Sequence, residues 1–347
     1  DVESMKRSID YYNRAIKIDP TYYLAYAELG NSFAQLYFRD GFDESNKEIA
    51  LSYIEKALSF DPNMDVAYKA KALTHYWSGE TLEGVKNDQI AISLNPSNVQ
   101  ALVNLSASYG NAGHIKGALE GINRAIELSP RSPLIRFYHA LNLERIGDED
   151  GALKTLKFGL EQSPGNWPCM NAMAMFYIIR KDKVTAEKHL KELKTLRKND
   201  NRINQTDLLF NYVFRNNNKA LDAYNNINKP NDTHKIIAIY LYKQLGNLKK
   251  STELIDELET KHSNRYQNNL GGRFSPRTLS RIYAIKGNYT EAINWLQRSI
   301  DRGERDYREF YAYPEFENMK SNPRFLNLIG LMKDLGNIEA MKIKTDI

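Results

Sequence analysis

The chain has 347 residues, more than one compact domain usually holds, so we expect either two or three domains or one elongated array of repeats. Hydrophobic residues make up 42% and charged residues 26%, which excludes a long disordered tail and a fibrous protein. The net charge of +5 comes from 48 basic and 43 acidic residues, a mixture that lacks the concentrated basic face of nucleic-acid-binding proteins.

The first expected helix covers roughly Ser4 to Ile18. Its apolar residues have the spacing of an amphipathic helix: Met5, Ile9, Tyr12, Ala15 and Ile16. The helix corresponds to only the second half of the repeat described below. Either it caps the array, or residues precede it in the native chain, and we favour the second interpretation.

The ending of this first helix recurs along the chain as an alanine followed five residues later by proline. The endings lie at Pro20, Pro62, Pro96 and Pro130, with a degenerate copy at Pro164. Three of the four intervals are 34 residues and the first is eight residues longer. Because proline has no backbone donor and disfavours helix in the residue before it, each ending terminates a helix. The period predicts a repeated helix-turn-helix unit.

A second signal marks the turn inside each unit, where a glycine precedes a small residue by five positions. A tight turn followed by a small residue lets two antiparallel helices approach closely. The pairs are Gly113 and Ala118, Gly147 and Ala152, Gly246 and Ser251, and Gly287 and Ala292.

These residues resemble the tetratricopeptide repeat, in which an aromatic, Leu-Gly and a second aromatic occupy the first helix. One unit carries Tyr26, Leu29, Gly30 and Phe33, and a later one carries Leu102, Leu105, Ser106 and Tyr109, followed by Ala118, Ile122, Ala125 and Pro130. A weaker match continues to Leu296. The resemblance implies an all-α, right-handed superhelical solenoid of antiparallel helix pairs, with about eight to nine repeats over residues 1–310.

Two polar stretches depart from the period, at residues 38–48 and 259–275. We expect longer loops or extended helices there, mobile rather than functional. The asparagine-rich segments 199–201 and 215–218 are expected to be turns between helices, since asparagine tolerates unusual backbone angles.

Residues 311–347 no longer follow the repeat and are predicted to form a helical cap over its open end. Apolar residues suited to this role are Phe316, Phe325, Leu328, Ile329 and Met332. Pro314 to Phe316, with Met319, Lys320 and Pro323 to Phe325, also resembles the closing segment of bacterial signalling proteins. In those proteins a tetratricopeptide array follows a winged-helix, nucleotide cyclase or kinase domain.

No catalytic, cofactor or metal site is predicted. The sequence lacks a phosphate-binding glycine loop, a zinc-protease helix, a calcium loop and a serine elbow, and Gly271-Gly272 lacks the strand and spacing of a phosphate site. The six histidines are dispersed, and Cys169, the single cysteine, is expected in the core.

In the tetratricopeptide family, first helices line a concave groove, and the resemblance nominates groove residues by their position in each repeat. Alternatively, Tyr76 and Trp77 only cover a neighbouring helix. The nominated residues are Asn31, Gln35, Lys69, Tyr76, Trp77, Gln100, Asn104, Asn111, Phe137, Glu144, Arg145, Asn171 and Met175. The set for clamping a peptide carboxylate is incomplete, because Leu134 and Tyr138 stand where basic residues are needed.

The function predicted from these features is a non-catalytic scaffold that binds a protein or peptide, as the C-terminal part of a larger bacterial regulator of signalling or transcription. The alternatives are a free-standing adaptor in a trafficking or envelope assembly and a small-molecule sensor. No stretch approaches the roughly 18 to 20 apolar residues that span a bilayer. The expected compartment is the cytoplasm, or outside the inner membrane if a membrane helix precedes Asp1. The partner and the oligomeric state are left open.

Overall fold

The computed structural model describes residues 2–39, 43–196 and 202–344, and all its regular elements in these ranges are helical. Eight antiparallel helix pairs follow helix α1 (Val2–Ile18) there, so the predicted all-α solenoid is confirmed. The first four pairs are α2 (Tyr23–Arg39) and α3 (Glu44–Phe60), α4 (Asp65–Ser78) and α5 (Thr81–Leu94), α6 (Val99–Asn111) and α7 (Ile115–Leu128), and α8 (Pro133–Arg145) and α9 (Glu149–Gln162).

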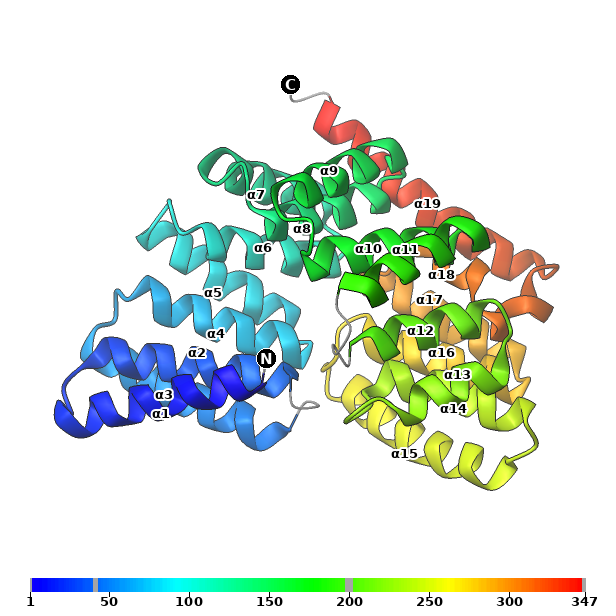
Figure 1. Ribbon diagram of the computed structural model, residues 1–347, viewed down its shortest axis with the longest axis horizontal. Helices are drawn as coiled ribbons and strands as arrows, with labels where there is room; N and C mark the ends of the chain where they lie inside the picture. Colours follow the sequence, from blue (N-terminus) through cyan, green and yellow to red (C-terminus); the bar gives the residue numbers. More distant parts are fainter. Residues whose placement is uncertain (1, 40–42, 197–201, 345–347) are drawn as a thin grey trace.

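The second four pairs continue the stack. They are α10 (Trp167–Ile179) and α11 (Lys183–Leu196), α12 (Ile203–Val213) and α13 (Asn217–Asn225), α14 (Asp232–Gln244) and α15 (Leu248–Gln267), and α16 (Phe274–Lys286) and α17 (Tyr289–Asp301). The chain ends with α18 (Tyr307–Ala312), the 3-10 helix η1 (Pro314–Met319) and α19 (Pro323–Lys344). In Figure 1 the solenoid curves from α2–α5 on one side, through α6–α11, to α12–α16 on the other side.

A left-handed residue closes the turn within seven of the pairs, always five positions before a small residue. A left-handed backbone is cheapest for glycine, which has no Cβ. Glycine fills five of the positions, whereas Lys181 and Arg215 adopt φ of 59° and 60° at the other two. The seven residues are Gly79, Gly113, Gly147, Lys181, Arg215, Gly246 and Gly287. Arg215 and Asn216 therefore form a turn as predicted, whereas Asn217 and Asn218 of the predicted segment begin α13. Residues 199–201 lie outside the described ranges.

The two polar stretches that depart from the period lengthen helices. Helix α2 extends to Arg39 and α3 begins at Glu44, and the Tyr37 hydroxyl donates a hydrogen bond to Glu44 over 3.1 Å. Helix α15 has 20 residues, more than its neighbours, and takes up much of the stretch 259–275. The extended-helix alternative is the one that the described residues adopt, and the α15 extension also contributes to the site described below.

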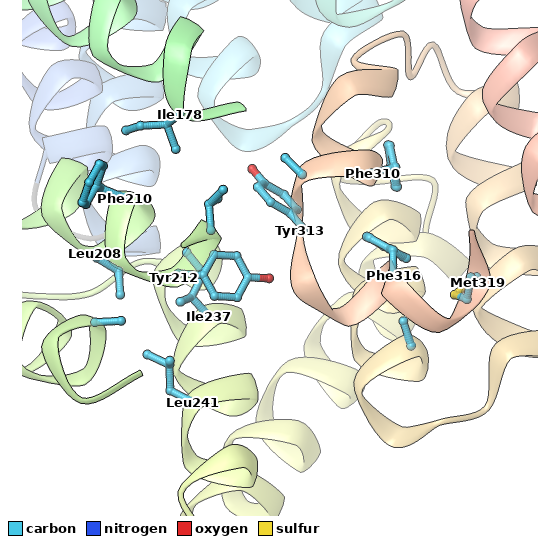
Figure 2. Close-up of a cluster of buried hydrophobic side chains, with 14 of the residues drawn as sticks. Ile178, Leu208, Phe210, Tyr212, Ile237, Leu241, Phe310, Tyr313, Phe316 and Met319 are labelled. Atoms are coloured by element: carbon cyan, nitrogen blue, oxygen red, sulfur yellow. The ribbon is translucent and has the colours of Figure 1, made fainter. Parts of the chain in front are cut away.

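The largest cluster of buried hydrophobic side chains lies in the second half of the chain and joins α10–α14 with α16, α17 and the C-terminal helices. Figure 2 shows Tyr212 of α12 and Tyr313, between α18 and η1, approaching each other in this cluster, and their ring centroids are 5.7 Å apart. The predicted capping residues Phe316, Phe325, Ile329 and Met332 are also buried in it. The C-terminal helices therefore share a core with the last repeats. No described helix is both long and apolar enough to cross a membrane.

Helices from the first half of the chain also touch the C-terminal segment. We call residues 2–162 (α1–α9) the N-terminal arm and residues 203–344 (α12–α19) the C-terminal arm. Arg145 Nε lies 3.4 Å from Asp306 Oδ1, and Arg308 Nη2 lies 2.6 Å from Glu149 Oε1. Helix α19 further contacts α7. The solenoid therefore closes on itself instead of leaving an open groove along its whole length.

Candidate binding cavity

A cavity of about 510 Å³ lies between the two arms. The N-terminal arm contributes the aromatic residues Tyr37, Tyr76 and Trp77, and α10 contributes Asn171 and Met175. The C-terminal arm contributes residues from α12, α14, α15, α16 and the segment after α17, including Leu209, His234, Arg265, Thr278 and Tyr313. This volume falls in the usual range for ligand pockets, as does the mixture of aromatic, amide and charged groups.

Three arginines, one at the N-cap of α16 and two within it, line the cavity. Arg273, Arg277 and Arg281 are spaced four residues apart, which places them on the same side of a helix. Carboxylates of the following segment pair with each of them. Arg273 lies 2.7 Å from Asp306, Arg277 lies 3.2 Å from Glu304, and Arg281 lies 2.6 Å from Glu315. Further ion pairs join Arg273 to Glu304 and Arg277 to Glu309.

This network extends to the N-terminal arm through Asn111 and Arg145. The Asn111 side-chain oxygen accepts hydrogen bonds from Arg145 and from Arg273, both at 3.3 Å. Burial by itself would raise the pKa of Asp306, but the guanidinium groups of Arg273, Arg145 and Arg277 outweigh it and hold that pKa well below its usual range. Asp306 is therefore ionised at neutral pH, and it bridges the two arms.

A second polar group on the cavity wall joins α14, α15 and α16. His262 Nε2 lies 3.0 Å from Asp232, and His262 Nδ1 lies 3.2 Å from the Ser275 hydroxyl. Burial favours a raised pKa for Asp232, but its hydrogen bond with His262 and the charge of Lys261 lower it overall. Ser275 has no exposed surface, and its hydroxyl packs against Gly271. The arrangement of serine, histidine and aspartate therefore connects three helices at the cavity wall.

The structure brings together some of the nominated groove residues and not others. Tyr76, Trp77, Asn111, Asn171 and Met175 line the cavity. Trp77 also stacks on Phe38 with ring centroids 3.7 Å apart, so the packing role and the cavity position coexist. Asn171 accepts a hydrogen bond from Thr206 over 2.6 Å and donates one to the Met175 sulfur over 3.2 Å.

The other nominated residues lie away from the cavity wall. Glu144 pairs with Arg180 at 3.0 Å, and Arg145 pairs with Asp306 behind the wall. The remaining six are on first helices of the N-terminal arm but do not line the cavity: Asn31, Gln35, Lys69, Gln100, Asn104 and Phe137.

Sequence reasoning missed most of the C-terminal wall. The three arginines at four-residue spacing were a visible signal of a charged helix face. The residues of the stretch 259–275, such as Lys261, His262 and Arg265, carried no comparable pattern because they interrupt the repeat. Only the contact between the arms places these residues opposite Tyr76 and Trp77.

No protein-family model matches the chain, and no curated protein sequence matches it. Among solved structures, the chain is similar to the human IFIT1 dimer with m7Gppp-AAAA, at 17% identity and a TM-score of 0.54 over 86% of this chain and 68% of that chain. A tetratricopeptide repeat protein from Parabacteroides merdae is similar at 13% identity and a TM-score of 0.44, over 78% of this chain and 98% of that one.

A third similar structure is YrrB, described as a TPR protein with an unusual peptide-binding site. It has 20% identity and a TM-score of 0.38 over 54% of this chain and 93% of that one. At these identities the similarity concerns the fold alone. The helix pairs and the turn geometry, together with the similarity to the IFIT1 structure, establish an all-α helical solenoid.

Proposed function

We propose that this chain is a non-catalytic scaffold that binds a segment of a protein or peptide in the cavity between its arms. The observation that carries this proposal is the composition of the cavity wall. Aromatic side chains from the N-terminal arm face amides and hydroxyls from α10, α12 and α16 across about 510 Å³. Aromatic anchors combined with hydrogen-bonding side chains suit a peptide, whose main chain needs polar partners and whose side chains need apolar contacts.

The charges of the cavity support a peptide over a polyanion. Arg273, Arg277 and Arg281 each pair with a carboxylate. A nucleic acid would have to displace those carboxylates before it could use the arginines, and neutralising phosphates is the main source of affinity in nucleic-acid binding. We therefore propose no nucleic-acid partner for this segment, although one structural neighbour is described with a capped RNA.

The setting of this scaffold is a further part of the proposal. Following the resemblance of residues 311–347, the array acts as the C-terminal partner-binding or sensory region of a larger bacterial regulator, in the cytoplasm or beyond the inner membrane. A free-standing adaptor in a trafficking or envelope assembly is the alternative. The intact mass of the natively expressed protein separates the two, because only the regulator needs an effector domain before Asp1. A product close to 40 kDa would rule out the regulator.

A small-molecule sensor is the second candidate function, and the cavity volume of about 510 Å³, within the usual range for ligand pockets, is the observation that favours it. A ligand that binds the folded state alone raises the melting temperature by mass action. A metabolite panel in a thermal-shift assay therefore tests the sensor directly. Stabilisation by one metabolite that is lost in Met175→Trp, which would fill the cavity, would support it.

Selection of phage-displayed random peptides on the immobilised chain, followed by fluorescence anisotropy of the selected peptides, tests the scaffold. We expect Asn171→Ala and Met175→Trp to weaken binding at least tenfold, because both residues line the cavity. Asn31→Ala and Gln100→Ala are matched controls, since these nominated groove residues lie outside the cavity, and they should leave affinity unchanged. The opposite pattern would place the peptide on the outer part of the groove. Failure to select any peptide would contradict the scaffold.

A further inference from the structure

Two pairs of glycines bring the backbones of the two arms close together. A Cβ added at Gly79 would lie 2.6 Å from the Gly271 Cα, and one added at Gly113 would lie 2.8 Å from the Gly303 Cα. Real Cβ atoms do not approach backbone this closely. In a third contact between the arms, Gly336 of α19 lies against the carbonyl oxygen of Arg145 at the end of α8. Each contact therefore requires a residue without a side chain.

From the first contact to the second, the position advances by one helix pair on each arm. Gly79 and Gly113 occupy the same turn position in successive pairs, and Arg145 lies two residues before the equivalent Gly147. On the other arm, Gly271 precedes α16 and Gly303 precedes α18, and both have positive φ. The two glycine pairs thus join the arms turn against turn, whereas Gly336 meets the end of α8 from within α19. We call this set of three contacts the glycine latch: Gly79 with Gly271, Gly113 with Gly303, and Arg145 with Gly336.

The residues around the glycine latch are polar. Arg265 donates a hydrogen bond to the carbonyl oxygen of Ser78, and Arg308 donates one to the carbonyl oxygen of Glu144 over 3.1 Å. Arg145 and Asp306 form the ion pair described above. Within the described ranges, none of the clusters of buried hydrophobic side chains contains residues of both the N-terminal arm and α14–α19.

An interface without an apolar core separates at low cost, as interfaces between domains of one chain commonly do. The same interface forms the cavity, since Tyr76 and Trp77 come from one arm and Arg277 and Tyr313 from the other. Opening the latch would therefore expose both walls without separating a hydrophobic cluster shared by the N-terminal arm and α14–α19. Closing the latch would bring the two walls together around a ligand in the cavity.

We propose that the glycine latch is a conformational clamp, through which the two arms open and close the central cavity. The inference uses the cavity of the proposed function but does not depend on a peptide being its ligand. Glycine at both sides lets the backbones meet, and the surrounding arginine contacts hold the closed form.

Small-angle X-ray scattering of glycine variants tests the clamp. In the double variant Gly79→Ala, Gly113→Ala each methyl group collides with backbone of the other arm, so we expect the radius of gyration to increase. The matched control is Gly246→Ala, Gly287→Ala. These turn glycines have φ of 79° and 87°, so alanine is equally strained, but among the described residues nothing lies within 4 Å of the added Cβ. The control should keep the wild-type radius.

A second pair of variants tests the latch without changing any turn. Arg308→Ala removes hydrogen bonds to Glu149 and Glu144 of the other arm, whereas Arg324→Ala removes one to Asn294 of its own arm. We expect only Arg308→Ala to increase the radius of gyration, and more so at high salt, which screens the remaining ion pairs. If the Gly79, Gly113 double variant and Arg308→Ala both scatter as wild type does, the clamp is wrong. Because scattering needs no ligand, that outcome is independent of the peptide selection.

Discussion

Asp88 on α5 occupies the position that Ile122 occupies on α7 one repeat later, and both side chains are fully buried. Each lies four residues after the small residue of its pair, Gly84 or Ala118, where other repeats carry Ile54, Leu156, Leu190 and Leu296. Neither carboxylate oxygen of Asp88 has a hydrogen-bond partner among the described residues. The repeat thus places an acid in a hydrophobic position, where removal from water disfavours its charge.

Replacing Asp88 with isoleucine should stabilise the protein. The substitution removes a buried polar group without a partner and restores the residue type of the neighbouring repeats, so the free energy of unfolding should rise by roughly 1 to 4 kcal/mol. Urea unfolding at pH 7 measures this change in the free energy of unfolding. Asp88→Asn removes the charge but keeps the polarity, and its gain should be smaller. A less stable Asp88→Ile protein would show that the carboxylate has a favourable role.

The dependence of stability on pH should also change with Asp88. Burial raises the pKa of this carboxyl well above its ordinary value of 3.8, while the charge of Lys69 opposes the shift. Between the unfolded and folded pKa values the folded state holds the extra proton. The contribution of Asp88 to stability is therefore fully present below about pH 4 and is lost as pH rises through the folded pKa. The free energy of unfolding should fall less steeply in Asp88→Asn than in wild type as the pH rises above about 4.

The contribution of His234 to stability should have the opposite dependence on pH, decreasing as the pH falls. Burial lowers its pKa from 6.5 to about 4, and its Nδ1 accepts a hydrogen bond from the Asn231 backbone in the capping box of α14. Stability from the neutral ring is present above pH 6.5 and is lost as pH falls towards 4, by an amount on the order of 3 kcal/mol. His234→Gln keeps a capping-box acceptor that does not titrate. In acid unfolding curves it should retain stability that wild type loses, and identical curves would argue against this role.

Lys181→Gly should stabilise the turn between α10 and α11. Lys181 adopts φ of 59° at the turn position that glycine fills in other repeats, as Gly113 and Gly147. A left-handed backbone costs a residue with a Cβ roughly 1 kcal/mol. The nearby charge of Lys320 complicates the comparison, because it contributes to lowering the pKa of Lys181 after burial, the main cause. Lys181→Ala removes the charge but keeps the Cβ, so the difference in melting temperature between the glycine and alanine variants isolates the backbone effect.

Glu315→Ala should be strongly destabilising. It leaves Arg281 buried without its carboxylate, 2.6 Å away in the native protein, and removes an acceptor for the Tyr212 hydroxyl. Loss of one partner of a buried ion pair costs about 3 to 5 kcal/mol. Glu317→Ala is the control, because its pair with Arg215 is exposed and should contribute less than about 1 kcal/mol. If chemical unfolding showed that both variants lose a similar free energy of unfolding, the structural role of the buried pair would be contradicted.

Local signals in the sequence determined the fold. The proline endings, the glycine turns and the small residues that follow them act within one repeat, so the helix pairs could be derived from spacing alone. Even at Lys181 and Arg215, where glycine is absent, the turn keeps its left-handed residue, because the small residue five positions later still requires close helices. First helices facing inwards could likewise be expected to place Asn111, Asn171 and Met175 on a binding surface.

Only the tertiary structure decided which residues of that binding surface line the cavity. The contact of Gly79 with Gly271 joins residues from opposite arms, and no periodic pattern encodes it. It depends on the accumulated curvature of many repeats, to which small rotations between neighbouring pairs all contribute. That curvature brings the α16 arginines opposite Tyr76 and Trp77 and leaves Asn31 and Gln100 outside the cavity. The repeat therefore specifies the unit and its inner face, whereas the sum of its rotations creates the cavity between the arms.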